Sequence, residues 1–174
     1  QHRSDCMTPT PPNPVQLGRL LIKVCLSYLA AVTVAYLLAS LFQTLAVLQA
    51  LTAAGGDYSA GDWLRALLHD LYGLAFGGKY VSYAQTIAIG LAIALPSAAV
   101  CLRWLPLPSA LVYALAGATA MLTILLVVKY NFYDLTLFAG SRGVLGMGLQ
   151  MLAGAIGGWV FARFIQRWQG AQHA

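Results

Sequence analysis

The chain has 174 residues, of which 60% are hydrophobic and only 9% are charged. Average soluble domains are roughly a quarter charged, so this composition excludes an ordinary soluble domain and indicates a membrane protein. The ten Lys and Arg residues outnumber five acidic residues, all Asp, and are scattered singly between apolar runs. A nucleic-acid-binding protein would present a clustered basic face, so we expect lipid headgroups, and no nucleic acid, as partners of these charges.

Length and cysteine usage narrow the class further. Four membrane spans of about 20 residues would use nearly the whole chain, which leaves no room for a separate soluble domain. Cys6, Cys25 and Cys101 form no CxxC pair, and none has a histidine partner at metal-ligand spacing. Three cysteines also make no even-numbered disulfide framework, so we expect no metal and no cofactor.

The first 54 residues divide into a tail and a long apolar run. Residues 1–18 are polar and rich in proline, which predicts a disordered tail because proline cannot occupy a helix interior. Residues 20–54 form an apolar run whose one charge is Lys23, near its start. This first span exceeds the length that a bilayer requires, so we expect it to tilt or protrude.

Residues 59–76 have the pattern of an amphipathic helix. Ser59 and Asp62 resemble a capping pair at its start. Apolar residues then recur at helical spacing from Trp63 to residue 71, whereas Asp62, Arg65 and His69 share the opposite face. This pattern predicts a helix that lies in the membrane interface between the first two spans.

Three further spans follow, at residues 81–102, 109–128 and 143–164, with Pro96 inside the first of them as an expected kink. Residues 169–174 form a short polar tail. The sequence therefore predicts an all-α integral membrane protein. Its single domain, residues 19–168, has about four transmembrane helices and one interfacial amphipathic helix.

Basic residues predict the orientation, because Lys and Arg are retained preferentially on the cytoplasmic side. With four spans, both termini share a side. That side carries six of the ten basic residues: Arg3, Arg19, Lys23, Arg103, Arg163 and Arg167. All three cysteines also fall on or near it. We therefore expect an integral protein of a bacterial inner (plasma) membrane with both termini in the cytoplasm.

The two loops expected on the outer side resemble each other. Each contains Asp-Leu, then Leu, Ala and Phe, then small residues and a cation. This similarity suggests a duplicated unit of span, loop and span. Alternatively, any loop that returns to a membrane needs glycine, an aromatic residue and a cation. The candidate binding residues of this outer face are Asp62, Arg65, His69, Asp70, Lys79, Lys129, Asp134 and Arg142.

The last span carries a stripe of small residues at steps of three and four. Such a stripe permits close approach of another helix, and Gln150 could form an interhelical hydrogen bond. The stripe could pack the chain's own helices or meet a partner subunit. The candidate packing residues are Gly143, Met147, Gln150, Gly154, Gly157 and Gly158.

Three functional hypotheses remain, and we assign no catalytic residue. The spans have no ionisable residue at their centres, which argues against a proton-coupled transporter. Small size and the absence of a catalytic motif favour a non-catalytic integral or accessory subunit that packs against a larger membrane complex or against itself. The first alternative is a small oligomeric channel, carrier or lipid-handling protein. The second is a membrane enzyme at the outer interface built from scattered Asp and His.

Overall fold

The protein is a bundle of helices. The computed structural model describes residues 14–53, 55, 59–76, 82–131 and 144–170. Within this part of the chain every regular element is a helix, in the order α1 (Pro14–Ala53), α2 (Ala60–Phe76), α3 (Tyr83–Cys101), α4 (Ser109–Asn131) and α5 (Val144–Gly170). All except α2 are long and apolar enough to cross a membrane. The predicted all-α fold with four candidate spans is confirmed.

The first helix starts earlier than the sequence predicts. It begins at Pro14, inside the expected tail of residues 1–18, whose first 13 residues lie outside the described part. Proline is tolerated there because an N–H in the first turn of a helix has no helical partner to lose. The helix ends at Ala53, and Gly55 follows with a φ of 93°. Glycine adopts this left-handed conformation without the steric cost of a Cβ.

Two capping arrangements begin the next helices. The predicted pair at α2 is confirmed: the Ser59 hydroxyl donates to the Asp62 carboxylate at 2.7 Å, and the Asp62 N–H donates to the Ser59 hydroxyl at 3.3 Å. An unpredicted capping box starts α3. The Gln85 N–H donates to the Ser82 hydroxyl, and the Ser82 N–H donates to the Gln85 side chain. These contacts satisfy N–H groups that have no helical partner.

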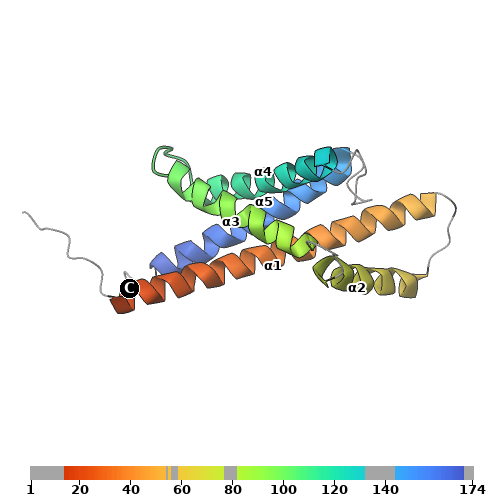
Figure 1. Ribbon diagram of the computed structural model, residues 1–174, viewed down its shortest axis with the longest axis horizontal. Helices are drawn as coiled ribbons and strands as arrows, with labels where there is room; N and C mark the ends of the chain where they lie inside the picture. Colours follow the sequence, from red (N-terminus) through yellow and green to blue (C-terminus); the bar gives the residue numbers. More distant parts are fainter. Residues whose placement is uncertain (1–13, 54, 56–58, 77–81, 132–143, 171–174) are drawn as a thin grey trace, which may run out of the picture.

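The bundle is organised around α5. This helix packs most extensively against α4 and α1, whereas α3 lies mainly on α4. Figure 1 shows α4 and α5 side by side, with α1 crossing beneath them. Small residues line the meeting of α1 with α5, and larger apolar residues of α3 and α4 complete the core. The fully buried core residues are Ala31, Ala35, Ala39, Ile87, Leu91, Met121 and Ala153.

Two contacts bring the start of α1, the start of α4 and the end of α5 to one end of the bundle. The Lys23 ammonium lies 5.3 Å from the centre of the Trp168 ring. Gln166 donates to the Ser109 hydroxyl at 2.8 Å. We call this the basic end. Five cations of the described chain lie near these helix ends or in the turn that leads into α4: Arg19, Lys23, Arg103, Arg163 and Arg167.

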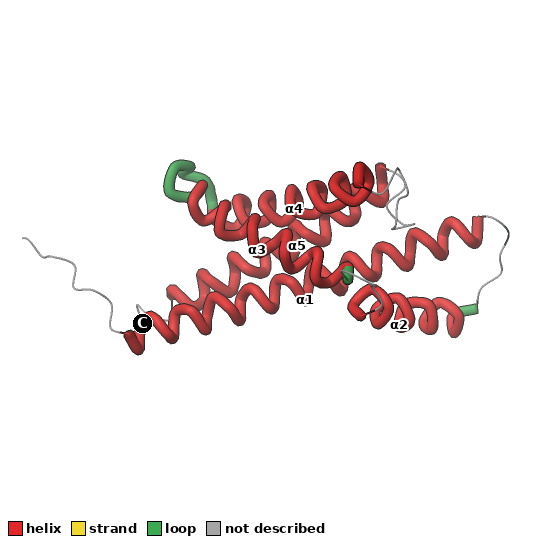
Figure 2. Tube along the Cα trace, viewed as in Figure 1, coloured by secondary structure: helices red, strands yellow, loops and turns green. Residues whose placement is uncertain are grey.

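At the opposite end, α1 continues beyond α4 and α5. Figure 2 shows α2 folded back alongside this part of α1, so that the two helices form a projecting hairpin. We call residues 41–53 of α1 together with α2 the outer arm, after the orientation that the sequence predicts. The described acidic residues, Asp62 and Asp70, both lie on α2. The two ends of the described structure therefore differ in charge.

Candidate functional site

Four of the predicted outer-face residues, all with described side chains, lie on α2. The side chain of His69 is 85% exposed, and its Nδ1 lies 3.9 Å from a carboxylate oxygen of Asp70. Asp62 and Arg65 are exposed as well. Hydrogen bonds from the side chain and backbone of Ser59 lower the pKa of Asp62, which stays charged at the start of α2. This face is a solvated charge network and contains one close His–Asp pair.

The other predicted outer-face residues cannot be placed. Lys79, Asp134 and Arg142 lie outside the described residues, and so does Gly143 of the packing stripe. Lys129 belongs to α4, but its side chain is not described. The expected pairing of the two outer loops therefore stays a prediction.

The second carboxylate oxygen of Asp70 lies near the first helix. The Thr44 hydroxyl lies 3.0 Å from the Asp70 carboxylate and 3.0 Å from the Ser40 carbonyl, so it can donate to either. Nearby, the Tyr36 hydroxyl donates to the Leu71 carbonyl. These contacts attach α2 to α1 at the base of the outer arm.

A second polar cluster lies inside the bundle, next to the base of the arm. Gln150 is 1% exposed and connects three helices. Its Nε2 donates to the Ala39 carbonyl of α1 at 3.1 Å, and its Oε1 accepts from the Tyr83 hydroxyl of α3 at 2.9 Å. In a membrane such hydrogen bonds fix the register of neighbouring helices, because buried polar groups must be paired. Sequence reasoning selected Gln150 but missed Tyr83.

The glycine stripe of α5 is occupied within the chain. A Cβ at Gly154 would approach the Gly117 carbonyl of α4 to less than 3.0 Å, and one at Gly158 would do the same to the Tyr113 carbonyl. Gly157 faces α1 instead, against Ala35. These three glycines therefore serve packing inside the bundle and are not free to receive a partner. Met147, nearer the start of α5, is half-buried.

A groove at the basic end was not predicted. It has a volume of about 480 Å³ and takes its walls from four helices. Its lining residues are Val24, Cys25, Tyr28, Ala92, Leu95, Pro96, Ala99, Tyr113, Phe161 and Ile165. The Tyr28 hydroxyl reaches across to donate to the Ala88 carbonyl of α3 at 2.6 Å, which connects two of the walls. Tyr113 and Phe161 pack edge to face on the opposite side, with ring centres 5.1 Å apart.

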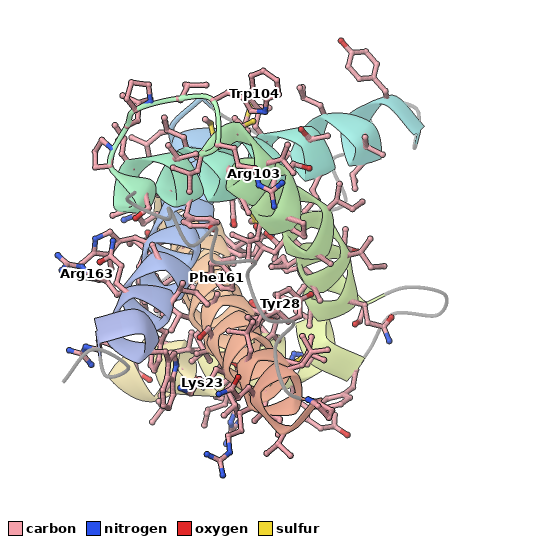
Figure 3. All side chains as sticks on the ribbon, turned by 90° about the vertical axis from the view of Figure 1, so that its left-hand side faces the viewer. Lys23, Tyr28, Arg103, Trp104, Phe161 and Arg163 are labelled. Carbon is pink, nitrogen blue, oxygen red and sulfur yellow. The ribbon has the colours of Figure 1, made fainter. Side chains whose placement is uncertain are left out.

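Cations flank this groove. In Figure 3, which looks onto the basic end, Tyr28 and Phe161 lie between α5 and α3, with Lys23 on the α1 side and Arg103 on the α3 side. Arg163 points away on the outer face of α5, where its guanidinium lies 4.9 Å from the centre of the Trp159 ring. Of the three cations labelled in Figure 3, Lys23 and Arg103 therefore flank the groove and Arg163 does not.

Searches against protein families, curated proteins and solved structures find no match to this chain.

Proposed function

We propose that the protein is a non-catalytic integral membrane subunit that docks through its outer arm onto another membrane protein. The observation that carries this proposal is an exposed apolar stripe on α2, in a hairpin that projects beyond the bundle (Figure 1). We further propose a bacterial inner membrane with both termini cytoplasmic, which would place the arm on the outer side.

The length of α1 requires part of it to leave the membrane or to tilt strongly. Its 40 residues extend about 60 Å, whereas a bilayer core is about 30 Å thick. Contacts with α5 hold α1 from Lys23 to Ala39. The remaining part of α1 carries α2, and the hairpin they form is therefore available to a partner.

The surface of α2 has three sectors. Trp63, Leu67 and Leu71 are half-buried, and Leu71 contacts α1 through its carbonyl. The charged sector described above is solvated. Between them runs an exposed apolar stripe at four-residue spacing: Leu64, Leu68, Tyr72 and Phe76. Residues four apart form one ridge of a helix, which is the surface that packs into the groove of another helix.

A photo-crosslinking amino acid at Leu68 would test the docking surface, with the same substitution at Ile93 as control. Leu68 is 58% exposed and Ile93 is 67% exposed. Ile93, however, lies on α3, which belongs to the bundle and not to the arm. We expect Leu68 to give one discrete protein adduct that copurifies stoichiometrically in mild detergent, and Ile93 to give lipid adducts. An adduct of twice the chain's mass would identify a second copy as the partner. Lipid adducts alone at Leu68, with a monomer in detergent, would contradict the proposal and assign the stripe to the membrane interface.

The alternatives have unequal support. The groove at the basic end favours a lipid-handling role as the second candidate, because its lining is almost wholly apolar and therefore suits hydrocarbon better than ions or polar solutes. For an enzyme, the described residues offer the exposed pair His69 and Asp70, and no group of three potential metal ligands occurs among them. The enzyme hypothesis therefore ranks third.

A further inference from the structure

We propose that the groove at the basic end holds one acyl chain of an anionic phospholipid, whose phosphate lies between Lys23 and Arg103. This inference is independent of the outer arm, which lies at the other end of the molecule. It rests on the shape and lining of the groove, on the charges around it and on its position near one end of the bundle (Figure 3).

The groove suits hydrocarbon. Its volume of about 480 Å³ lies within the range of roughly 300–1,000 Å³ found for sites that enclose small ligands. Its polar side-chain groups are the Cys25 thiol and the hydroxyls of Tyr28 and Tyr113, and the Tyr28 hydroxyl already donates to a backbone carbonyl. Ordered water needs several polar partners, so an apolar groove between membrane spans is filled more favourably by a lipid chain.

The headgroup preference follows from charge. Lys23 directly precedes Val24, which lines the groove from α1, and Arg103 follows the lining residue Ala99 by four positions. The acidic residues of the described chain lie on α2, so the described basic end has five cations and no carboxylate side chain. Basic pockets between membrane helices bind the phosphates of anionic lipids by this combination of charge and burial.

Aromatic residues indicate that these cations lie at headgroup depth. Trp104, 81% exposed, directly follows Arg103. Trp168 lies beneath the Lys23 ammonium. Tryptophan is enriched at the boundary between hydrocarbon and water, where its ring meets both. A lipid whose phosphate lies between these cations would therefore extend its chain into the groove beside Tyr28 and Phe161.

Native mass spectrometry of the full chain would test the headgroup site, with phosphatidylglycerol and phosphatidylcholine of identical acyl chains as probes. We expect one retained phosphatidylglycerol per chain and much weaker retention of phosphatidylcholine. Lys23→Gln and Arg103→Gln should each weaken the binding of phosphatidylglycerol about fivefold. The double variant should weaken it about 25-fold, as expected for roughly 1 kcal/mol per cation. The control Arg65→Gln removes the same charge from the outer arm and should leave retention unchanged.

A second pair of variants tests the groove itself. Ala92→Trp should fill the groove and abolish retention, whereas Ile93→Trp, on the neighbouring exposed surface, should not. Equal retention of both lipids, no retained lipid in the wild type, or equal losses with Arg65→Gln and Lys23→Gln would each overturn the proposal. Retention unaffected by Ala92→Trp would also overturn it, because the lipid would then lie elsewhere. Arg103→Gln changes an exposed residue, so it remains informative if Ala92→Trp fails to fold.

Discussion

Replacing Gly154 by alanine should loosen the contact between α4 and α5. The new Cβ would lie less than 3.0 Å from the Gly117 carbonyl and from the Met121 side chain. Met121 can rotate away, but the carbonyl belongs to the backbone of α4 and is fixed by its own helix. The two helices must therefore move apart, which loosens their packing along the whole crossing.

The net effect can be estimated from two opposing terms. Overpacking a close contact typically costs about 1–3 kcal/mol, whereas replacing glycine by alanine inside a helix gains up to about 1 kcal/mol. We expect Gly154→Ala to lower the free energy of unfolding by about 1–2 kcal/mol. Gly148 provides the matched control on the same helix, because nothing lies within 4 Å of a Cβ built there. Gly148→Ala should be neutral or stabilising by up to about 1 kcal/mol.

Unfolding in mixed micelles with increasing denaturing detergent, followed by circular dichroism, would measure both variants. A shift of the midpoint with an unchanged slope indicates a change in stability alone. Gly117→Ala should destabilise similarly, and the double variant Gly117→Ala/Gly154→Ala should lose less than the sum of the singles because both report one contact. If Gly154→Ala proved as stable as Gly148→Ala, the close backbone approach between α4 and α5 would be refuted.

Three further predictions concern other parts of the molecule. Tyr83→Phe and Gln150→Leu should each lower the free energy of unfolding by about 0.5–2 kcal/mol, and their double variant should lose less than the sum, measured in the same micelles. Because hydrogen bonds from Ser59 lower the pKa of Asp62, the carboxylate stabilises α2 above the ordinary Asp pKa of about 4 and ceases to do so as pH falls through the lowered value. The protection factors of amides in the first turn of α2, corrected for the intrinsic pH dependence of exchange, should therefore fall in acid. Asp62→Asn should remove this change. In a cysteine-free background, Ser59→Cys should react with an impermeant maleimide applied outside intact cells. Leu107→Cys should react only after the cells are permeabilised. The reverse pattern would invert the proposed orientation.

The helices were predictable from local pattern, but their ends were less so. Long apolar runs identify spans because the bilayer imposes a minimum length on them. Hydropathy, however, predicts where the chain leaves the membrane and not where the helix ends. The sequence predicts that the last span ends at residue 164, yet α5 continues to Gly170, through Gln166 and Arg167. Nothing in those residues breaks a helix, so it extends past the apolar region.

The sites show the same division between local and long-range information. A small-residue motif marks Gly154 and Gly158 as places of close approach, but their partners Gly117 and Tyr113 depend on which helix lies opposite. The groove depends still more on tertiary structure, because its lining comes from four helices and consists of ordinary apolar span residues. Only the relative placement of α3 against α1 and α5 turns those residues into a site.

The packing of α1 differs between the two ends of the molecule. Along its first half, Ala31 and Ala35 meet Gly157, and small side chains on both helices permit a close, extended contact with α5. That contact reaches Ala39, where Gln150 binds the backbone of α1. Beyond this point α1 is held mainly by its own hairpin partner, through groups such as Thr44 and Asp70. Local stability follows local packing, so we expect the arm to open at a lower free-energy cost than the glycine-packed bundle that holds the groove at its far end.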